Sequence, residues 1–159
     1  MLTVPSDVAA LAGNTITIPI RLQTNGNEIN SLIFSLDLDQ AWLAIDADHL
    51  EDVISFDLPN GFILSPAFDA SDADGELDFV IYHPTNPKAK LTDGDIILIT
   101  IQTGSPVNPT LASILASQDP RASFANTSGQ SIGGILVDGA VYISGSGLQQ
   151  VYLPMTMFK

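Results

Sequence analysis

Apolar and polar residues alternate strictly over two long stretches of this chain, residues 15–23 and residues 30–39. A period of two residues places every second side chain on the same face of an extended strand. The apolar sets are Ile16, Ile18, Ile20 and Leu22 in the first stretch, and Leu32, Phe34, Leu36 and Leu38 in the second. Both stretches are therefore predicted to be strands with one buried face.

Shorter segments of the same kind follow, separated by turn residues. Further strands are predicted at residues 43–46, 62–68, 77–82, 96–101, 111–116 and 140–143. Residues 96–101 are apolar on both faces, which is typical of a central strand, whereas the pattern of residues 111–116 fits a helix or a strand. No long segment has helical periodicity. About nine strands with turn punctuation predict an all-β fold, a two-sheet antiparallel β-sandwich of the nine-stranded jelly-roll type.

Two local features refine this prediction. Pro19 lies inside the first alternating stretch, and proline has no backbone N–H to donate, so we expect an unpaired or bulged position there. Asn25 and Gly26 directly after that stretch predict a tight turn.

Composition and charge narrow the function. The 159 residues are enough for one domain with a real core. Acidic residues outnumber basic ones by 18 to 5, and a net charge of -13 repels phosphate backbones, so we expect no nucleic-acid partner. Without cysteine the chain forms no disulfide. No apolar run reaches about 18 residues, so no membrane span is predicted.

Few residues form patterns typical of catalysis or metal binding. The chain contains no Gly-x-Ser-x-Gly elbow, so we expect no enzyme. Asp69, Asp72 and Asp74 lie near Gly75, but their spacing does not match an EF-hand loop; a solvated turn is expected, and weak calcium binding is the alternative. His49 and His83 do not form a zinc-binding pair, and we expect both at the surface.

Five motifs occur in one order: residues 39–43, 74–82, 93–101, 123–126 and 137–143. In that order they resemble the cohesin modules of bacterial cellulosome scaffoldins, over roughly residues 2–144. The resemblance implies a non-catalytic jelly roll that binds dockerins, which are small calcium-loaded helical modules. No cofactor is implied for this chain, since the calcium belongs to the dockerin. The resemblance also favours a strand at residues 111–116, and it makes Trp42, the only tryptophan, a packing residue.

In cohesins the docking surface is the flat face of the sheet formed by the third, fifth, sixth and eighth strands. Transferred by position, the resemblance predicts these partner-binding residues: Ser31, Ile33, Ser35 and Asp37 on the third strand, Ser65 and Ala67 on the fifth, and Asp78, Val80 and Tyr82 on the sixth, with His83 at its rim. The eighth strand is not assigned. The family often has Asn and Asp where this chain has Ser31 and Ile33, which puts ordinary cellulosomal specificity in doubt.

The alternatives are a structural or adhesive β-sandwich of a cell-surface protein and, third, a carbohydrate-binding module. Residues 1–144 are expected to form the sandwich, and residues 145–159 a linker and an apolar tail. This tail resembles the short Tyr-Leu-Pro tails that end many bacterial surface proteins. Together with the acidic charge, it predicts an extracellular or cell-surface location in a prokaryote. A homo-oligomer formed through the tail or a sheet face is left open.

Overall fold

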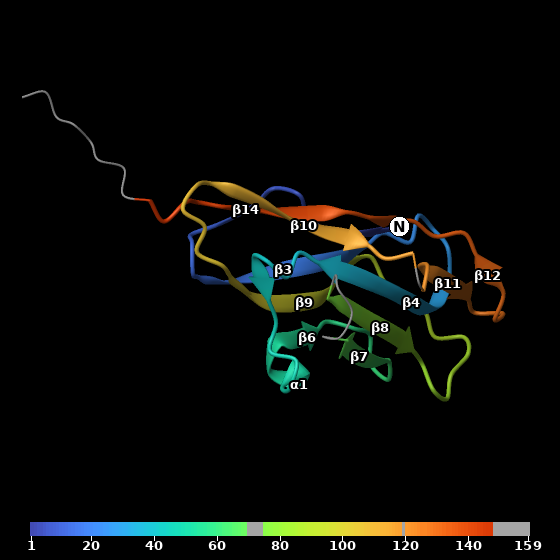
Figure 1. Cartoon of the computed structure of the whole chain (residues 1–159). Coiled ribbons are helices and arrows are strands. Elements are labelled where there is room, and N and C mark those ends of the chain that lie inside the picture. The colour runs from blue at the N-terminus through green and yellow to red at the C-terminus, as the bar shows by residue number, and fades with distance from the viewer. Residues whose placement is uncertain (70–74, 119, 148–159) are drawn as a thin grey trace, which may run out of the picture.

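The computed structural model describes residues 1–69, 75–118 and 120–147. Two β-sheets pack face to face, and one short helix lies at their edge (Figure 1). We call the six-stranded sheet A and the eight-stranded sheet B. The predicted two-sheet sandwich is confirmed.

Sheet A is built around the long pair β3–β9, with short strands on either side. Its members are β1 (Leu2–Thr3), β3 (Thr15–Leu22), β5 (Leu43–Ala44), β6 (Ile54–Phe56), β9 (Gly94–Thr103) and β13 (Leu136–Val137). The strand order is β13-β1-β3-β9-β5, and β6 also pairs with β9. The helix α1 (Leu50–Val53) lies between β5 and β6 in the chain. Strand β9 has neighbours on both edges, as its two apolar faces predict.

Sheet B is built around β4, the longest strand of that sheet. Its members are β2 (Val8–Ala10), β4 (Ile29–Leu38), β7 (Ile63–Asp69), β8 (Glu76–Tyr82), β10 (Thr110–Ala116), β11 (Ser123–Asn126), β12 (Ser131–Ile132) and β14 (Gly139–Ile143). Strand β8 pairs with β4 along one edge, and β7 pairs with β8 beyond it. The other edge of β4 pairs with β10 near its end and with β11 near its start.

The strand segments outnumber the predicted nine because several strands are interrupted. Strands β5 and β6 both pair with β9, and β10 and β11 both pair with β4. The pairs are antiparallel as predicted, except for the short edge pairs β1–β13 and β2–β14, which are parallel. The ambiguous segment 111–116 lies in β10 and is a strand.

The core lies between the sheets and includes the predicted inward residues, of which Ile16 is only partly buried. Ile18, Phe34, Phe79, Ile99 and Val141 are almost completely buried. The alternation in β3 and β4 therefore places their apolar faces inward, and burial of this apolar surface is the main force that holds the sheets together.

Both local predictions for the first long strand are confirmed. Pro19 pairs with β9 only, because β1 ends opposite Arg21, and the ladder shifts register between Ile20 and Arg21. Asn25 and Gly26 both have positive φ, 53° and 80°, and the N–H of Asn27 donates to the carbonyl of Thr24 at 3.0 Å. These features define a type I′ turn.

Two further observations concern the limits of the domain. Across the described ranges, no helix is long and apolar enough to cross a membrane. Ser146 and Gly147 donate backbone hydrogen bonds to the carbonyls of Pro106 and Val107, at 2.7 and 3.1 Å. The segment predicted to begin the linker is thus attached to the sandwich as far as Gly147. The apolar tail, residues 148–159, lies outside the described residues, and its role stays a prediction.

Candidate functional site: the outer face of β4, β7 and β8

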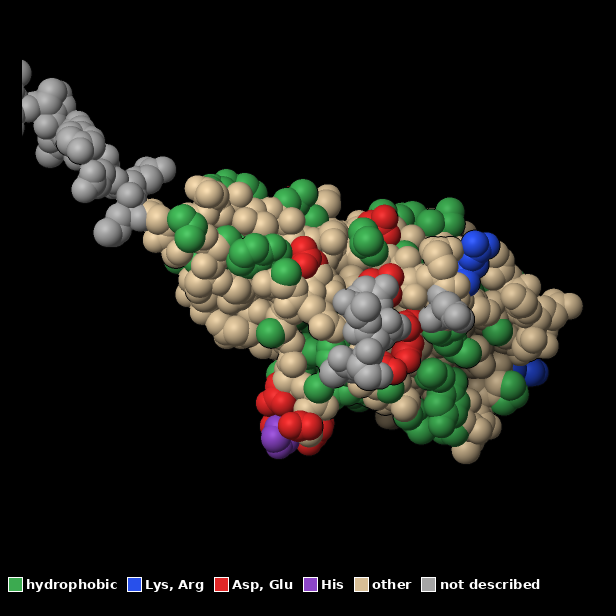
Figure 2. Space-filling view, in the orientation of Figure 1, with side chains coloured by type: hydrophobic (Ala, Val, Ile, Leu, Met, Phe, Trp, Pro, Cys, Tyr) green, Lys and Arg blue, Asp and Glu red, His purple; other side chains and the backbone are tan. Residues whose placement is uncertain are grey.

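The outward side chains of three neighbouring strands form one continuous surface, which we call the β4–β8–β7 face. Its members are Ser31, Ile33, Ser35 and Asp37 on β4, Glu76, Asp78, Val80 and Tyr82 on β8, and Ile63, Ser65, Ala67 and Asp69 on β7. Ser35 lies on this side of the sheet but is completely buried, so this predicted partner-binding residue has no surface to offer a partner. Strand pairing brings together all the predicted partner-binding residues except His83. Figure 2 shows acidic side chains and an apolar patch on the side of the molecule that carries these strands.

Apolar residues occupy one end of the face. Ile33 lies directly opposite Val80, and Ile63 directly opposite Tyr82. Ile33, Ile63 and Tyr82 are 43%, 41% and 40% exposed, so three large apolar side chains meet water side by side. Sequence reasoning missed Ile63, although the alternation of its strand places it on the same face as Ser65 and Ala67.

Carboxylates occupy the other end of the face. Glu76 lies between Asp37 and Asp69, directly opposite each of them on the two flanking strands. Like charges in directly opposed positions destabilise a sheet. Asp78 lies one row closer to the apolar end and accepts a hydrogen bond from the hydroxyl of Ser35. Sequence reasoning also missed Glu76, which the alternation through Asp78, Val80 and Tyr82 could have identified.

Glu76 has a raised pKa. Burial is the main cause that raises the pKa of its carboxyl group, and the charges of Asp78 and Asp37 raise it further. The hydroxyl group of Ser117, and to a smaller extent that of Ser35, act in the opposite direction. Its Oε1 atom is buried without a hydrogen-bond partner among the described residues. One oxygen of the Glu76 carboxylate is therefore unsatisfied within the described part of the chain.

The eighth strand, which the sequence left unassigned, is divided between β10 and β11. Leu115 on β10 lies opposite Asp37, and Ser123 and Ala125 on β11 lie opposite Ile33 and Ser31. These residues continue the β4–β8–β7 face across the other edge of β4. Leu115 is exposed and adds apolar surface beside the acidic end.

His83 lies just beyond the end of β8 and stabilises a loop. Its Nδ1 accepts a hydrogen bond from the N–H of Asn86 at 3.0 Å, and its ring packs edge-on against Phe62, with centroids 5.3 Å apart. The imidazole is half-buried in these contacts. His49, by contrast, is exposed beside Asp46 near α1.

The acidic loop is only partly described. Asp69 ends β7 opposite Glu76, whereas Asp72 and Asp74 lie outside the described residues. Within the described ranges, no group of three or more His, Asp or Glu side chains is arranged to hold a metal ion. Weak calcium binding by this loop stays a prediction.

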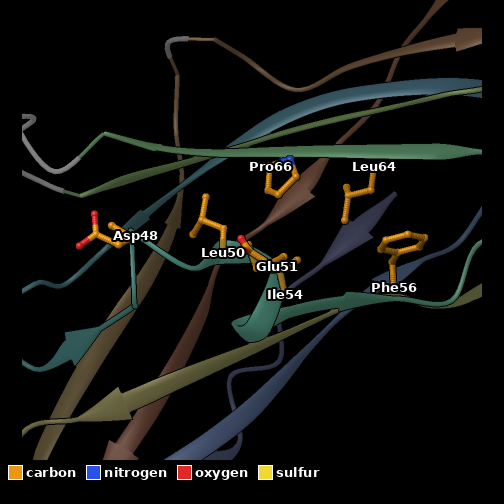
Figure 3. Close-up of a pocket in the computed structure, with 8 residues that line it drawn as sticks. Asp48, Leu50, Glu51, Ile54, Phe56, Leu64 and Pro66 are labelled. Carbon is orange, nitrogen blue, oxygen red and sulfur yellow. The ribbon is translucent and has the colours of Figure 1, made fainter.

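A groove opens on the inner side of β7, away from the face. It has a volume of about 450 Å³ and is lined mainly by apolar side chains from β7, α1 and β6 (Figure 3). Among the described residues, its acidic members are Asp48 and Glu51, and no histidine, serine or threonine lines it. The groove therefore offers no nucleophile–base pair.

The single tryptophan is not an exposed platform. Trp42 is half-buried and packs against the core. A Cβ atom on Gly104 would lie 3.0 Å from its indole ring, a tighter contact than most Cβ atoms make, so glycine eases this close approach. This arrangement agrees with the predicted packing role.

No protein-family model matches the chain, and no curated protein matches its sequence. Its structure is similar to solved structures of cohesins. The third cohesin of ScaC from Acetivibrio cellulolyticus, solved in complex with the ScaB dockerin, has a TM-score of 0.68 and 18% identity, and the match covers 91% of this chain and all (100%) of that one.

Two further cohesins show how far the similarity extends. A non-cellulosomal cohesin from the archaeon Archaeoglobus fulgidus matches with a TM-score of 0.66 and 13% identity, over 91% of both chains. The module CaCohA2 from Clostridium acetobutylicum matches with a TM-score of 0.66 and 14% identity, over 92% of this chain and 93% of that one. The chain has the fold of a cohesin module.

Proposed function

We propose that this chain is a non-catalytic interaction module that binds a calcium-loaded dockerin through the β4–β8–β7 face. One observation carries the proposal. The apolar residues Ile33, Ile63, Val80 and Tyr82 are adjacent on three paired strands of a cohesin fold and face outward together. A cohesin of this fold has been solved in complex with a dockerin.

The composition of the face supports a specific protein interface. An apolar centre with polar groups around it is the usual anatomy of such interfaces. Here Ser31 and Ser65 flank the apolar residues, and the acidic end lies beyond them on one side only. Single apolar residues on a protein surface are ordinary, but four neighbours in register form a patch. Tyr82 is the expected hot spot, because aromatic side chains contribute strongly to binding energy.

A carbohydrate-binding role has less support. Such modules stack sugar rings on a row of exposed aromatic side chains. The exposed rings of the described residues are Phe56 on β6, Tyr82 on β8 and Tyr142 on β14, which belong to three separate strands and two sheets. Trp42 packs against the core instead. No aromatic row is therefore formed by these residues.

The proposal also covers the cofactor, other partners and the location of the protein. The calcium is supplied by the dockerin, and this chain needs no cofactor of its own. Its acidic surface disfavours nucleic acid as a partner. We place the protein outside the cell or on the cell surface of a prokaryote. A purely structural or adhesive sandwich is the competing account.

A pull-down tests the proposal. The full chain is immobilised and exposed to purified dockerin modules of the source organism, in calcium and again after chelation. Retention of at least one dockerin in calcium, lost on chelation, is the expected result. If every correctly folded dockerin passes through in calcium, the structural alternative becomes the better account.

A further inference from the structure

We propose that the apolar segment 148–159 folds back onto sheet B of the same chain and covers an apolar surface on the outer side of β10 and β14. This surface, which we call the β10–β14 surface, is centred on Leu111 and Tyr142. Leu111 has no opposite residue on β4, because the ladder between β10 and β4 begins only at Ile114. The proposed contact is thus separate from the β4–β8–β7 face and independent of the proposed function.

Strand pairing builds the β10–β14 surface from three strands. Tyr142 on β14 lies directly opposite Leu111 on β10 and, on its other side, directly opposite Ala9 on β2. Leu111 and Tyr142 are 65% and 51% exposed, and Val107 and Leu11, in the loops next to these strands, are 72% and 64% exposed. Figure 2 shows hydrophobic side chains over β10 and β14. Single exposed apolar residues are ordinary, but neighbouring ones form a patch, which indicates a contact site.

The last described residues run beside this surface. Ser144 donates its backbone N–H to the carbonyl of Ala10 at 2.9 Å, and Gly147 donates to the carbonyl of Val107 at 3.1 Å. A Cβ atom on Gly145 would lie 2.5 Å from the carbonyl oxygen of Val107, so glycine lets the two segments lie this close. The next residue of the chain therefore begins beside Val107, at the margin of the β10–β14 surface.

The composition of segment 148–159 matches such a surface. The segment contains no acidic residue, although the chain as a whole has 18. Its one charged side chain is Lys159, which a protein with a net charge of -13 attracts. Most of its other side chains are large and apolar: Leu148, Val151, Tyr152, Leu153, Met155, Met157 and Phe158. Contact between these side chains and the β10–β14 surface removes apolar area of both from water, which is favourable.

The length and the attachment of the segment favour contact within one chain. Twelve residues reach about 40 Å when extended, whereas three neighbouring strands span only about 10 Å. Gly147 precedes the segment, and the backbone freedom of glycine allows the chain to reverse its direction there. Because the segment is covalently attached beside the surface, its effective concentration there is roughly millimolar. A second copy of the chain in dilute solution competes poorly with it.

Paramagnetic relaxation in NMR tests this inference on the full chain. The chain has no cysteine, so Ala9→Cys places a single spin label at an exposed position of the β10–β14 surface. The matched control is Ser65→Cys, an exposed position on β7. A third protein combines Ala9→Cys with Leu111→Ser and Tyr142→Ser. Its folding should survive, because both residues are exposed, and thermal unfolding checks this.

The amide signals of segment 148–159 should lose most of their intensity with the label at position 9 and keep it with the label at position 65. The Leu111 and Tyr142 substitutions should restore the intensity in the Ala9→Cys protein. A mixture of spin-labelled chain with unlabelled, isotope-enriched chain should show no loss, and loss there would mean that a second copy supplies the segment. No loss with the label at position 9, loss with the label at position 65, or loss that survives the two substitutions would also overturn the inference.

Discussion

Phe34 and Phe79 stack directly beneath the β4–β8–β7 face, with ring centroids 4.9 Å apart and ring planes inclined by 25°. They occupy directly opposed positions on β4 and β8, and both are fully buried. The pair holds the two central strands of the face in register from the core side. The same alternation that turns these rings inward turns Ile33, Ser35, Asp78 and Val80 outward.

Phe79→Ala should reduce the free energy of unfolding by about 3–5 kcal/mol, because it removes a buried ring and leaves a cavity. Urea denaturation followed by circular dichroism measures the loss. Phe56→Ala is the matched control, since Phe56 on β6 is 53% exposed and should cost little. Equal, small losses for both variants would contradict the assigned core.

Gly134→Ala should destabilise the fold, whereas Gly133→Ala should not. A Cβ atom on Gly134 would lie 1.7 Å from the ring of the buried Phe124, while a Cβ atom on Gly133 would meet nothing within 4 Å. The clash forces Phe124 or the backbone to move and should cost about 1–3 kcal/mol. Thermal unfolding of the two variants checks this, and similar melting temperatures would show that the packing around Phe124 is misassigned.

Glu76→Gln should stabilise the protein at neutral pH. Because the pKa of Glu76 is raised in the folded state, ionising this group costs more in the folded than in the unfolded chain. The penalty is absent below the unfolded pKa of about 4.3 and complete once the pH exceeds the raised folded value.

The melting temperature of Glu76→Gln should therefore exceed that of the parent at pH 7. The gain should shrink as the pH falls through the raised folded pKa and be lost below about 4.3. Glu51→Gln, the same change at an exposed position on α1, is the control. A melting temperature at pH 7 that falls in Glu76→Gln would mean that the carboxylate is stabilised by contacts this account does not include.

The strands of this fold could be predicted because the alternation in residues 15–23 and 30–39 is strict, and a shift by one residue would turn every apolar side chain to the wrong face. Interruptions were harder to foresee. The break between β10 and β11 depends on contacts between residues far apart in the chain. The same holds for the parallel pairing of β1 with β13 and of β2 with β14.

The site could be predicted only in part, for the same reason. The two-residue alternation of apolar and polar side chains is enough to identify the outward residues of β4 and β8. Strand pairing brings these residues together. Ile63 and Glu76 were missed, because their importance comes from the residues opposite them, Tyr82 on β8 and Asp37 on β4. His83 adjoins the predicted sheet face in sequence, but its ring contacts Phe62.

The central claim is tested most directly by titrating a calcium-loaded dockerin of the source organism into three proteins by calorimetry: the parent, Tyr82→Ala and Tyr142→Ala. Tyr82 and Tyr142 are exposed tyrosines of the same sheet, 40% and 51% accessible, but only Tyr82 lies on the proposed docking face. The account predicts a loss of about 2 kcal/mol or more for Tyr82→Ala, little change for Tyr142→Ala, and intact folding of both. Equal affinities for all three proteins, or a loss confined to Tyr142→Ala, would contradict it.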